Sequence, residues 1–132
     1  MTSQVVTNEL LIDGLDDWVY LAQLKGILLH VAGITNEQVI MEEALATLDV
    51  VLRAGFVEIG DVIKNVGFVP WNMSIEAALD RVRREWQQLN GGPSLGDICW
   101  LQNTPKGNCE AEKVLKAERG NTSSESTSAG KG

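Results

Sequence analysis

The stretch from Trp18 to Ile34 is the most apolar part of the chain, and it constrains the fold more than any other segment. Polar residues interrupt it, so it cannot supply the roughly 20 apolar residues that a transmembrane helix needs. Its apolar side chains fall nearly all round a helical wheel, and a helix of that kind is buried on most sides. We therefore predict a central helix that begins after an N-cap at Asp13, runs to about Ala32 and is ended by Gly33.

A second helix is expected between Thr35 and Gly55. Thr35 is the predicted N-cap, with Gln38 as the reciprocal half of a capping box. Apolar residues then recur at helical spacing, namely Met41, Ala44, Leu45, Leu48, Val51 and Leu52. The segment is long enough to be one long helix or two short ones, and Gly55 is the expected stop.

Three short segments have the character of strands. Residues 56–59 alternate apolar and polar positions, with a turn expected at residues 60–61. Residues 67–71 form a second extended piece, which Pro70 confines to an edge or an end of a sheet. Residues 98–101 form the third. These strands predict a small sheet beside the helices.

The remainder of the chain is expected to be helical and then disordered. Ser74 is the predicted N-cap of a helix that runs to about Leu89. A turn at residues 104–107 leads into a short polar helix over residues 108–118. Residues 120–132 are mainly Gly, Ser, Thr and Glu without an apolar anchor, so burial cannot offset the entropy of ordering them.

Two segments resemble the winged-helix superfamily. The first is residues 48–61, LDVVLRAGFVEIGD, in which a helix is followed by a glycine, an apolar residue and a valine. This pattern resembles the point in winged-helix proteins where the recognition helix ends and the first strand of the wing begins. Residues 100–107, WLQNTPKG, are similar to the closing wing strand of regulators of the multiple-antibiotic-resistance and PadR types. The whole chain is also similar to small uncharacterised bacterial proteins with the layout W-x-L, G-D-I-x-W-L and T-P-x-G.

The resemblance implies a winged-helix-like core over residues 1–119 as one domain, followed by a disordered tail over residues 120–132. The expected class is α+β, mainly α with a small antiparallel sheet. A usual wing is a short hairpin, whereas here residues 60–97 separate the strands and include a whole helix. The core must therefore accommodate an inserted helix.

The net charge of −7 is concentrated in the first 54 residues, which hold eight acids and two bases. DNA binding takes most of its affinity from Lys and Arg on phosphates. The predicted second helix, which would enter the groove, carries Glu42, Glu43 and Asp49 with only Arg53. We therefore expect a protein partner, of basic character, on an acidic helical surface, and no membrane partner. Nucleic acid is disfavoured by charge.

Six residues are the candidate partner contacts: Glu42, Glu43, Asp49, Trp71, Arg81 and Arg84. Trp71 follows a proline in a loop and is therefore expected to be partly exposed. It is a candidate contact because aromatic side chains often anchor interfaces. The other tryptophans, Trp18, Trp86 and Trp100, fall on predicted core stripes. The arginines lie near Arg83 in the only basic cluster able to touch phosphate, although a solvated helix face explains them equally well.

No catalytic residue, metal site or cofactor is predicted. His30 is the only histidine, and Cys99 and Cys109 match no zinc spacing and are expected to be free thiols. The N-terminal segment has neither a basic region nor an apolar core of a secretory signal, so a cytoplasmic location is expected. These features favour a non-enzymatic interaction or regulatory module.

Two alternatives stay open. One is a DNA-binding transcriptional regulator of the winged-helix type. The other is an enzyme or small-ligand binder, which needs a deep cavity near Trp71, Asp61 and Asp97, because paired carboxylates can serve acid–base chemistry. Two turn aspartates are the simpler explanation of Asp61 and Asp97.

Overall fold

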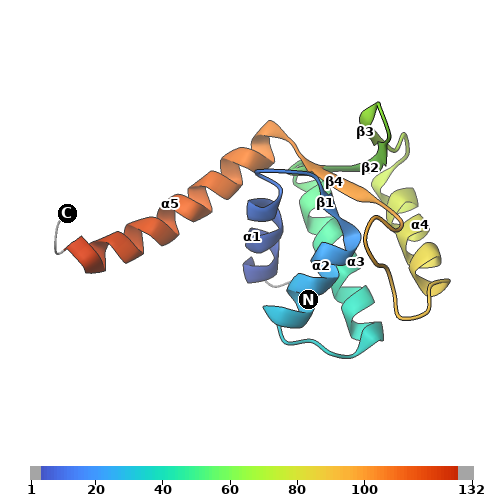
Figure 1. Ribbon diagram of the computed structural model, residues 1–132, viewed down its shortest axis with the longest axis horizontal. Helices are drawn as coiled ribbons and strands as arrows, with labels where there is room; N and C mark the ends of the chain where they lie inside the picture. The colour runs from blue at the N-terminus through green and yellow to red at the C-terminus, as the bar shows by residue number, and fades with distance from the viewer. Residues whose placement is uncertain (1–3, 128–132) are drawn as a thin grey trace.

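The computed structural model describes residues 4–127, with side chains as far as residue 118. This part of the chain is α+β, as predicted, with five helices and four strands. The elements are α1 (Gln4–Asp13), β1 (Val19–Tyr20), α2 (Leu21–His30), α3 (Glu37–Arg53), β2 (Val57–Ile63), β3 (Gly67–Pro70), α4 (Ile75–Gln87), β4 (Trp100–Asn103) and α5 (Pro105–Thr127). Figure 1 shows the sheet in front of α3, and α5 extending away from the other elements.

The prediction of one central helix after Asp13 is wrong. Asp13 is the last residue of α1, and the chain then forms the two-residue strand β1 before α2 begins. Val19 and Tyr20 pair with Leu101 and Trp100 of β4, which lie at least 80 residues away in sequence. A long-range strand pairing thus divides a run of residues whose local pattern is helical.

The second predicted helix is a single helix, α3. Its N-cap is Asn36 rather than Thr35, because the side chain of Asn36 accepts a hydrogen bond of 3.0 Å from the Val39 backbone N–H. At the other end Gly55 has a φ of 76°, a left-handed conformation that glycine adopts without strain. The predicted stop is therefore confirmed and the predicted capping box is not.

The sheet is antiparallel throughout, in the order β1-β4-β2-β3. The strand β2 runs straight through the turn that the sequence predicts at residues 60–61, and the chain reverses after Ile63. Its first half pairs with β4 and its second half with β3, so Gly60 is opposite both Trp100 and Pro70. The strands on either side of the inserted segment, β2 and β4, therefore pair directly. As predicted, β3 is at the edge.

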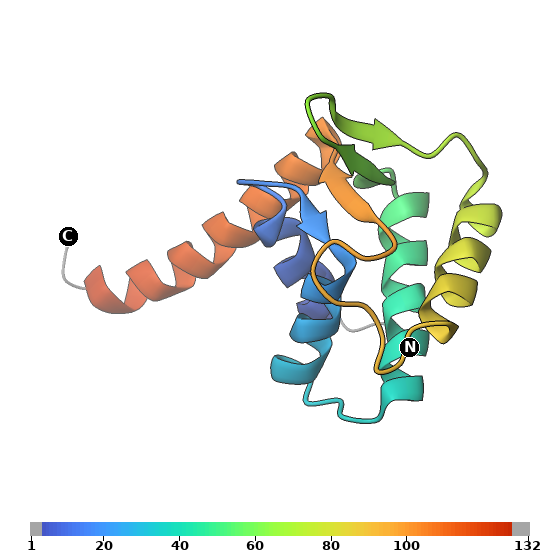
Figure 2. The same cartoon turned by 45° about the vertical axis from the view of Figure 1, so that its right-hand side comes forward.

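The inserted helix α4 begins after Ser74, whose side chain accepts a hydrogen bond of 3.1 Å from the Ala77 backbone N–H, as the sequence predicts. In Figure 2 α4 lies alongside α3. α5 begins at Pro105, where the sequence predicts a turn, because the Thr104 hydroxyl accepts from the Gly107 N–H at 3.1 Å. α5 continues to Thr127 and so includes the first part of residues 120–132, which the sequence predicts to be disordered. Residues 128–132 lie outside the described part of the chain.

One apolar core joins α1, α2, α3, α4 and the inner face of the sheet. Trp86 is 3% exposed and belongs to this core, as predicted. Trp18 and Trp100 are only half-buried, so the prediction that they are core residues is wrong. They lie on the sheet face that points away from the helices. No helix among residues 4–127 has an apolar stretch long enough to cross a membrane.

Candidate functional site

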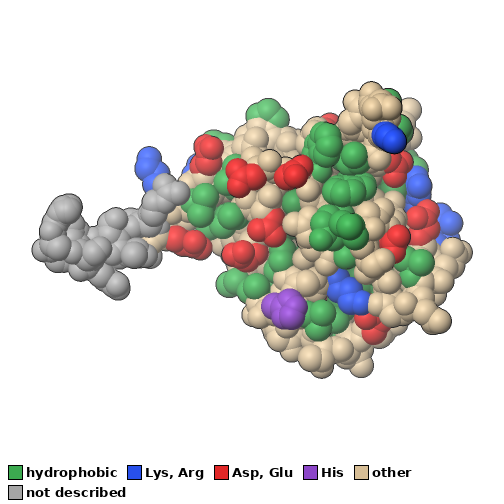
Figure 3. All heavy atoms as spheres, in the orientation of Figure 1, with side chains coloured by type: hydrophobic (Ala, Val, Ile, Leu, Met, Phe, Trp, Pro, Cys, Tyr) green, Lys and Arg blue, Asp and Glu red, His purple; other side chains and the backbone are tan. Residues whose placement is uncertain are grey.

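The outward face of the sheet carries aromatic side chains. Because side chains alternate between the two faces of a strand, the buried Val19 and Leu101 point to the helices and their neighbours Tyr20 and Trp100 point outward. The two outward rings are in edge-to-face contact, with centroids 5.5 Å apart. Figure 3, in the orientation of Figure 1, shows hydrophobic side chains gathered over the sheet. Trp18, Tyr20, Trp100 and Gln102 define what we call the outer sheet face.

A chain of hydrogen bonds holds Trp18 on this face. Its indole Nε1–H donates to Gln102 Oε1 at 2.9 Å, and Gln102 Nε2 donates to Glu58 Oε1 at 3.2 Å. The backbone N–H of Trp18 donates to Asp17 Oδ1 at 2.7 Å. Both N–H groups of Trp18 thus have partners within the protein, and the ring is left to make stacking or apolar contacts.

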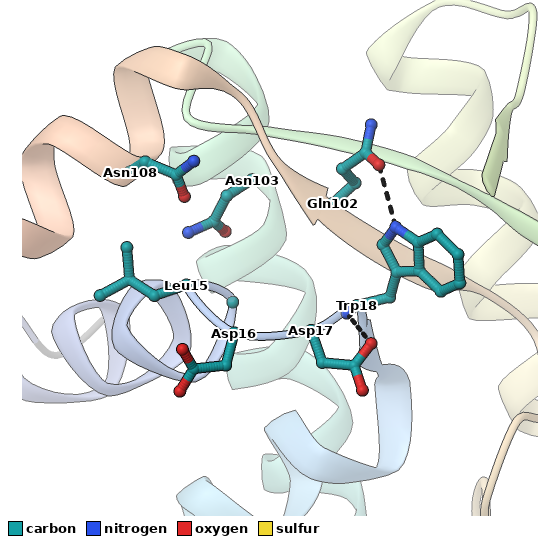
Figure 4. A pocket seen from close by; sticks show the side chains of 8 residues that line it. Leu15, Asp16, Asp17, Trp18, Gln102, Asn103 and Asn108 are labelled. Atoms are coloured by element: carbon teal, nitrogen blue, oxygen red, sulfur yellow. Dashed lines mark hydrogen bonds between the residues drawn. The ribbon is translucent and has the colours of Figure 1, made fainter. Parts of the chain in front are cut away.

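Beside Trp18 lies a cavity of about 320 Å³, shown in Figure 4. It is formed by the α1–β1 loop, β4 and the first turn of α5, and its lining residues are Gly14, Leu15, Asp16, Asp17, Trp18, Gln102, Asn103 and Asn108. Figure 4 shows the carboxylates of Asp16 and Asp17 on one side and the amides of Asn103 and Asn108 on the other. We call this the loop cavity.

The two amides of the loop cavity differ in their bonding. Asn103 Nδ2 donates to the Leu11 carbonyl oxygen at 2.9 Å, which fixes that side chain. The Oδ1 atom of Asn108 is buried and has no hydrogen-bond partner among the described residues. A buried acceptor without a donor costs about 1–3 kcal/mol. Because this oxygen is shielded from solvent, a molecule in the loop cavity can reach it only after the Asn108 side chain moves.

The acids next to the loop cavity have no basic partner among the side chains that the structure describes. Neither Asp16 nor Asp17 takes part in an ion pair among the described side chains. Burial raises the pKa of the neighbouring Asp13 above its ordinary value, without a cation to oppose the effect. Figure 3 shows acidic side chains gathered on the side of the molecule from which α5 extends. This region carries uncompensated negative charge.

The acids that the sequence places on an open helix face have a different environment. Glu42 of α3 accepts from the Arg83 guanidinium of α4, with a distance of 2.9 Å from Nη2 to Oε1, and this hydrogen bond lowers the pKa of Glu42. Asp49 binds Arg53, which also reaches Glu76 of α4 at 3.1 Å. Arg83 of the inserted helix thus neutralises Glu42, whereas Asp49 is neutralised within α3 by Arg53.

The other candidate contacts are dispersed. Glu43 is half-buried on α3. The Arg81 guanidinium lies 3.9 Å from the centroid of the Trp71 ring, and Trp71 Nε1 donates to Asp61 Oδ2 at 3.0 Å. Trp71 is half-buried, which confirms its predicted partial exposure. Arg84 pairs with Asp80 within α4 at 2.8 Å.

The residues considered for chemistry do not form one site. Asp97 accepts hydrogen bonds of 2.9 Å from the backbone and hydroxyl of Ser94, and the backbone bond lowers its pKa as in a turn aspartate. The cavity of about 270 Å³ beside it includes neither Trp71 nor Asp61 in its lining. Among the described residues no three His, Cys, Asp or Glu side chains are grouped so as to hold a metal ion.

Sequence reasoning missed the outer sheet face and the loop cavity. Trp18 was assigned to a helix stripe, and Asn103 and Asn108 were assigned no role, because their meeting with residues 14–18 depends on the pairing of β1 with β4. The available signal was the run of two aspartates before an aromatic residue. Comparisons with protein-family models, curated proteins and solved structures found no match for this chain.

Proposed function

We propose that this protein is a non-enzymatic interaction module that binds a basic protein partner through the acidic surface next to the outer sheet face. The observation that carries the proposal is the pair Asp16 and Asp17, two carboxylates beside the half-buried Trp18 that have no ion-pair partner among the described side chains. Interfaces draw much of their binding energy from aromatic anchors, and complementary charge speeds and orients association. Glu42 and Asp49 of α3, by contrast, already have arginine partners.

We further propose that the core is of the winged-helix type, with α4 inserted into the wing. The direct pairing of β2 with β4 supports this arrangement, because it brings together the two segments that resemble the opening and closing strands of a wing. The position of α4 along α3 supports a protein-binding rather than a DNA-reading role, since a helix that reads bases needs an open face in the major groove.

A matched pair of variants tests the choice of surface. The wild type, Asp16→Asn/Asp17→Asn and Glu42→Gln/Asp49→Asn are immobilised and used to capture binding proteins from native lysate. A partner recovered by the wild type is then purified and its Kd measured against all three at two salt concentrations. Asparagine keeps an Oδ1 that accepts from the Trp18 N–H, so the first variant removes charge with little change of shape.

We expect Asp16→Asn/Asp17→Asn to weaken binding about tenfold or more, since charged hydrogen bonds contribute about 1.5–3 kcal/mol each. Glu42→Gln/Asp49→Asn should bind within about twofold of the wild type, because exposed ion pairs contribute little. Higher salt should weaken the wild-type complex. The opposite ranking of the two variants would place the interface on α3, and a reconstituted complex unaffected by either variant or by salt would contradict the proposal.

The DNA-binding alternative has one favourable observation, the pairing of the two wing-like strands. Its weakness is charge, because Arg81, Arg83 and Arg84 each pair with a carboxylate of the same protein. A mobility-shift titration with mixed-sequence duplex DNA at low salt tests it. We expect no shifted band, and salt-sensitive binding of duplex would favour this alternative.

A further inference from the structure

We propose that the outer sheet face binds a proline-rich segment of the partner with a basic residue next to the prolines. This inference rests on the proposed function and names the kind of segment that the partner presents. The segment belongs to another chain, because the three prolines of this protein lie far apart in its sequence. Three features carry the inference, which are the aromatic surface, an accessible hydrogen-bond donor on it and the carboxylates at its border.

The aromatic surface consists of two successive rows across the sheet. Tyr20 of β1 is opposite Trp100 of β4, and these two rings form one row. Trp18 lies in the next row, where it bonds to Gln102. Successive outward rows of a sheet are about 7 Å apart, and roughly two residues of a polyproline II helix span this distance. Proline-rich segments dock on aromatic side chains, and their preformed conformation keeps the entropic cost of binding low.

The accessible donor is the indole Nε1–H of Trp100. It makes no hydrogen bond to any residue that the structure describes, and it is not a buried atom, so a ligand can reach it. The corresponding groups of Trp18, Trp71 and Trp86 each donate to a side chain of the same protein. A polyproline II backbone has solvated carbonyl oxygens, and proline itself has no N–H. The face therefore offers a donor to a segment that is rich in acceptors.

The carboxylates at the border favour a basic residue beside the prolines. Asp16, Asp17 and Glu58 have no ion-pair partner among the described side chains. Glu58 is opposite Gln102 in the sheet, and Asp17 directly precedes Trp18. Figure 3 shows acidic side chains beside the hydrophobic group over the sheet. Complementary charge would orient a lysine or arginine of the partner towards this border.

The same carboxylates disfavour single-stranded nucleic acid as the occupant. Bases also stack on aromatic side chains, but proteins that bind them use a positively charged groove for the phosphates. Here the phosphates would meet Asp16, Asp17 and Glu58 instead. The aromatic surface therefore fits a basic, proline-rich segment better than it fits a nucleic acid.

The test is a nuclear magnetic resonance titration of the ¹⁵N-labelled full chain with a blocked peptide of about six prolines followed by a pair of arginines, which spans about 25 Å as a polyproline II helix. We expect saturable shifts of the indole N–H signals of Trp18 and Trp100. The signal of Trp86, which is buried and bonded to Glu37, is the internal control and should not shift.

Two matched peptides separate the contributions of proline and of charge. In one, glycine and serine replace the prolines, and in the other, glutamates replace the arginines. Each should bind about tenfold more weakly or worse, because the first loses the preformed helix and the second meets like charge. Equal affinity for the glycine–serine peptide would overturn the inference. So would tighter binding of oligothymidine than of the proline–arginine peptide, which would assign the face to single-stranded nucleic acid.

Three variants complete the test. Trp100→Phe keeps an aromatic ring without the N–H and should bind the proline–arginine peptide severalfold more weakly. Asp16→Asn/Asp17→Asn should weaken binding about tenfold, whereas Glu76→Gln/Asp80→Asn, which removes the same charge from α4, should bind within about twofold of the wild type. Full affinity in both Trp100→Phe and Asp16→Asn/Asp17→Asn would contradict the assigned face. If Trp100→Phe does not fold, the comparison of peptides on the wild type decides alone.

The two proposals fail separately. If Asp16→Asn/Asp17→Asn loses the protein partner but the proline–arginine peptide causes no saturable shift, the interaction surface stands and the proline-rich segment is refuted. If the peptide binds at Trp18 and Trp100 but the partner from lysate binds Asp16→Asn/Asp17→Asn at full affinity, the peptide site stands and the proposed interface with that partner is refuted.

Discussion

Gly60 is a position where the structure makes a sharp prediction about stability. A Cβ atom there would lie 2.2 Å from the Val69 carbonyl oxygen and 2.7 Å from the Pro70 Cα, both backbone atoms of β3. Normal contact between such atoms needs roughly 1 Å more, and a side-chain rotation cannot supply it. Gly60→Ala therefore has to push β3 away from β2. Overpacking of this kind costs about 1–3 kcal/mol.

Gly26 provides the matched control, because the same substitution there should have the opposite sign. It lies inside α2, and a Cβ at this position meets nothing within 4 Å. Alanine in a helix interior is favoured over glycine by about 0.5–1 kcal/mol. The unfolding free energies of Gly60→Ala and Gly26→Ala should therefore differ by about 2–4 kcal/mol.

Equilibrium unfolding in urea, followed by tryptophan fluorescence, measures this difference. With a slope of about 1–3 kcal/mol per molar urea, the two midpoints should be separated by about 0.7 M or more. A Gly60→Ala variant as stable as the wild type would refute the close approach of β2 and β3. A destabilised Gly26→Ala variant would refute the open space described around α2.

Three further predictions follow from single groups. Thr104→Ala should lower the unfolding free energy by about 1–2 kcal/mol, because the hydroxyl accepts from the Gly107 N–H at the start of α5, and Thr104→Ser should restore most of it in a thermal melt. Asp13→Asn should raise the melting temperature at neutral pH, because burial raises the folded-state pKa of Asp13 and its ionisation therefore opposes folding. This gain should disappear as the pH falls from the raised folded-state pKa towards the ordinary value of 3.8, and an equal gain at low pH would contradict this cause. With a thiol reagent, the exposed Cys109 should react in the native protein, whereas Cys99, which is buried with a raised pKa, should react only after denaturation.

The sequence by itself determined the helices whose signals are local. α3 and α4 carry apolar stripes at helical spacing, and Gly55 and Ser74 mark their limits through backbone conformation and capping. Such signals act over a few residues, so they can be read without the rest of the fold. The edge position of β3 was equally readable, because Pro70 cannot donate a hydrogen bond to a further strand.

Only the tertiary structure decided the elements that depend on distant partners. Residues 19–20 have helix-forming neighbours, and they become a strand because β4 pairs with them. Glu42 seemed open because its partner, Arg83, lies 41 residues away on another helix.

The loop cavity is decided in the same way, since it joins residues 14–18 to residues 102–108. The periodicity of a sequence shows which side chains share one face of a helix or strand. Which helices and strands come into contact is decided by the packing of the whole core. The acidity of this protein could therefore be read from its sequence, whereas the structure showed which carboxylates have a basic partner, such as Glu42 with Arg83.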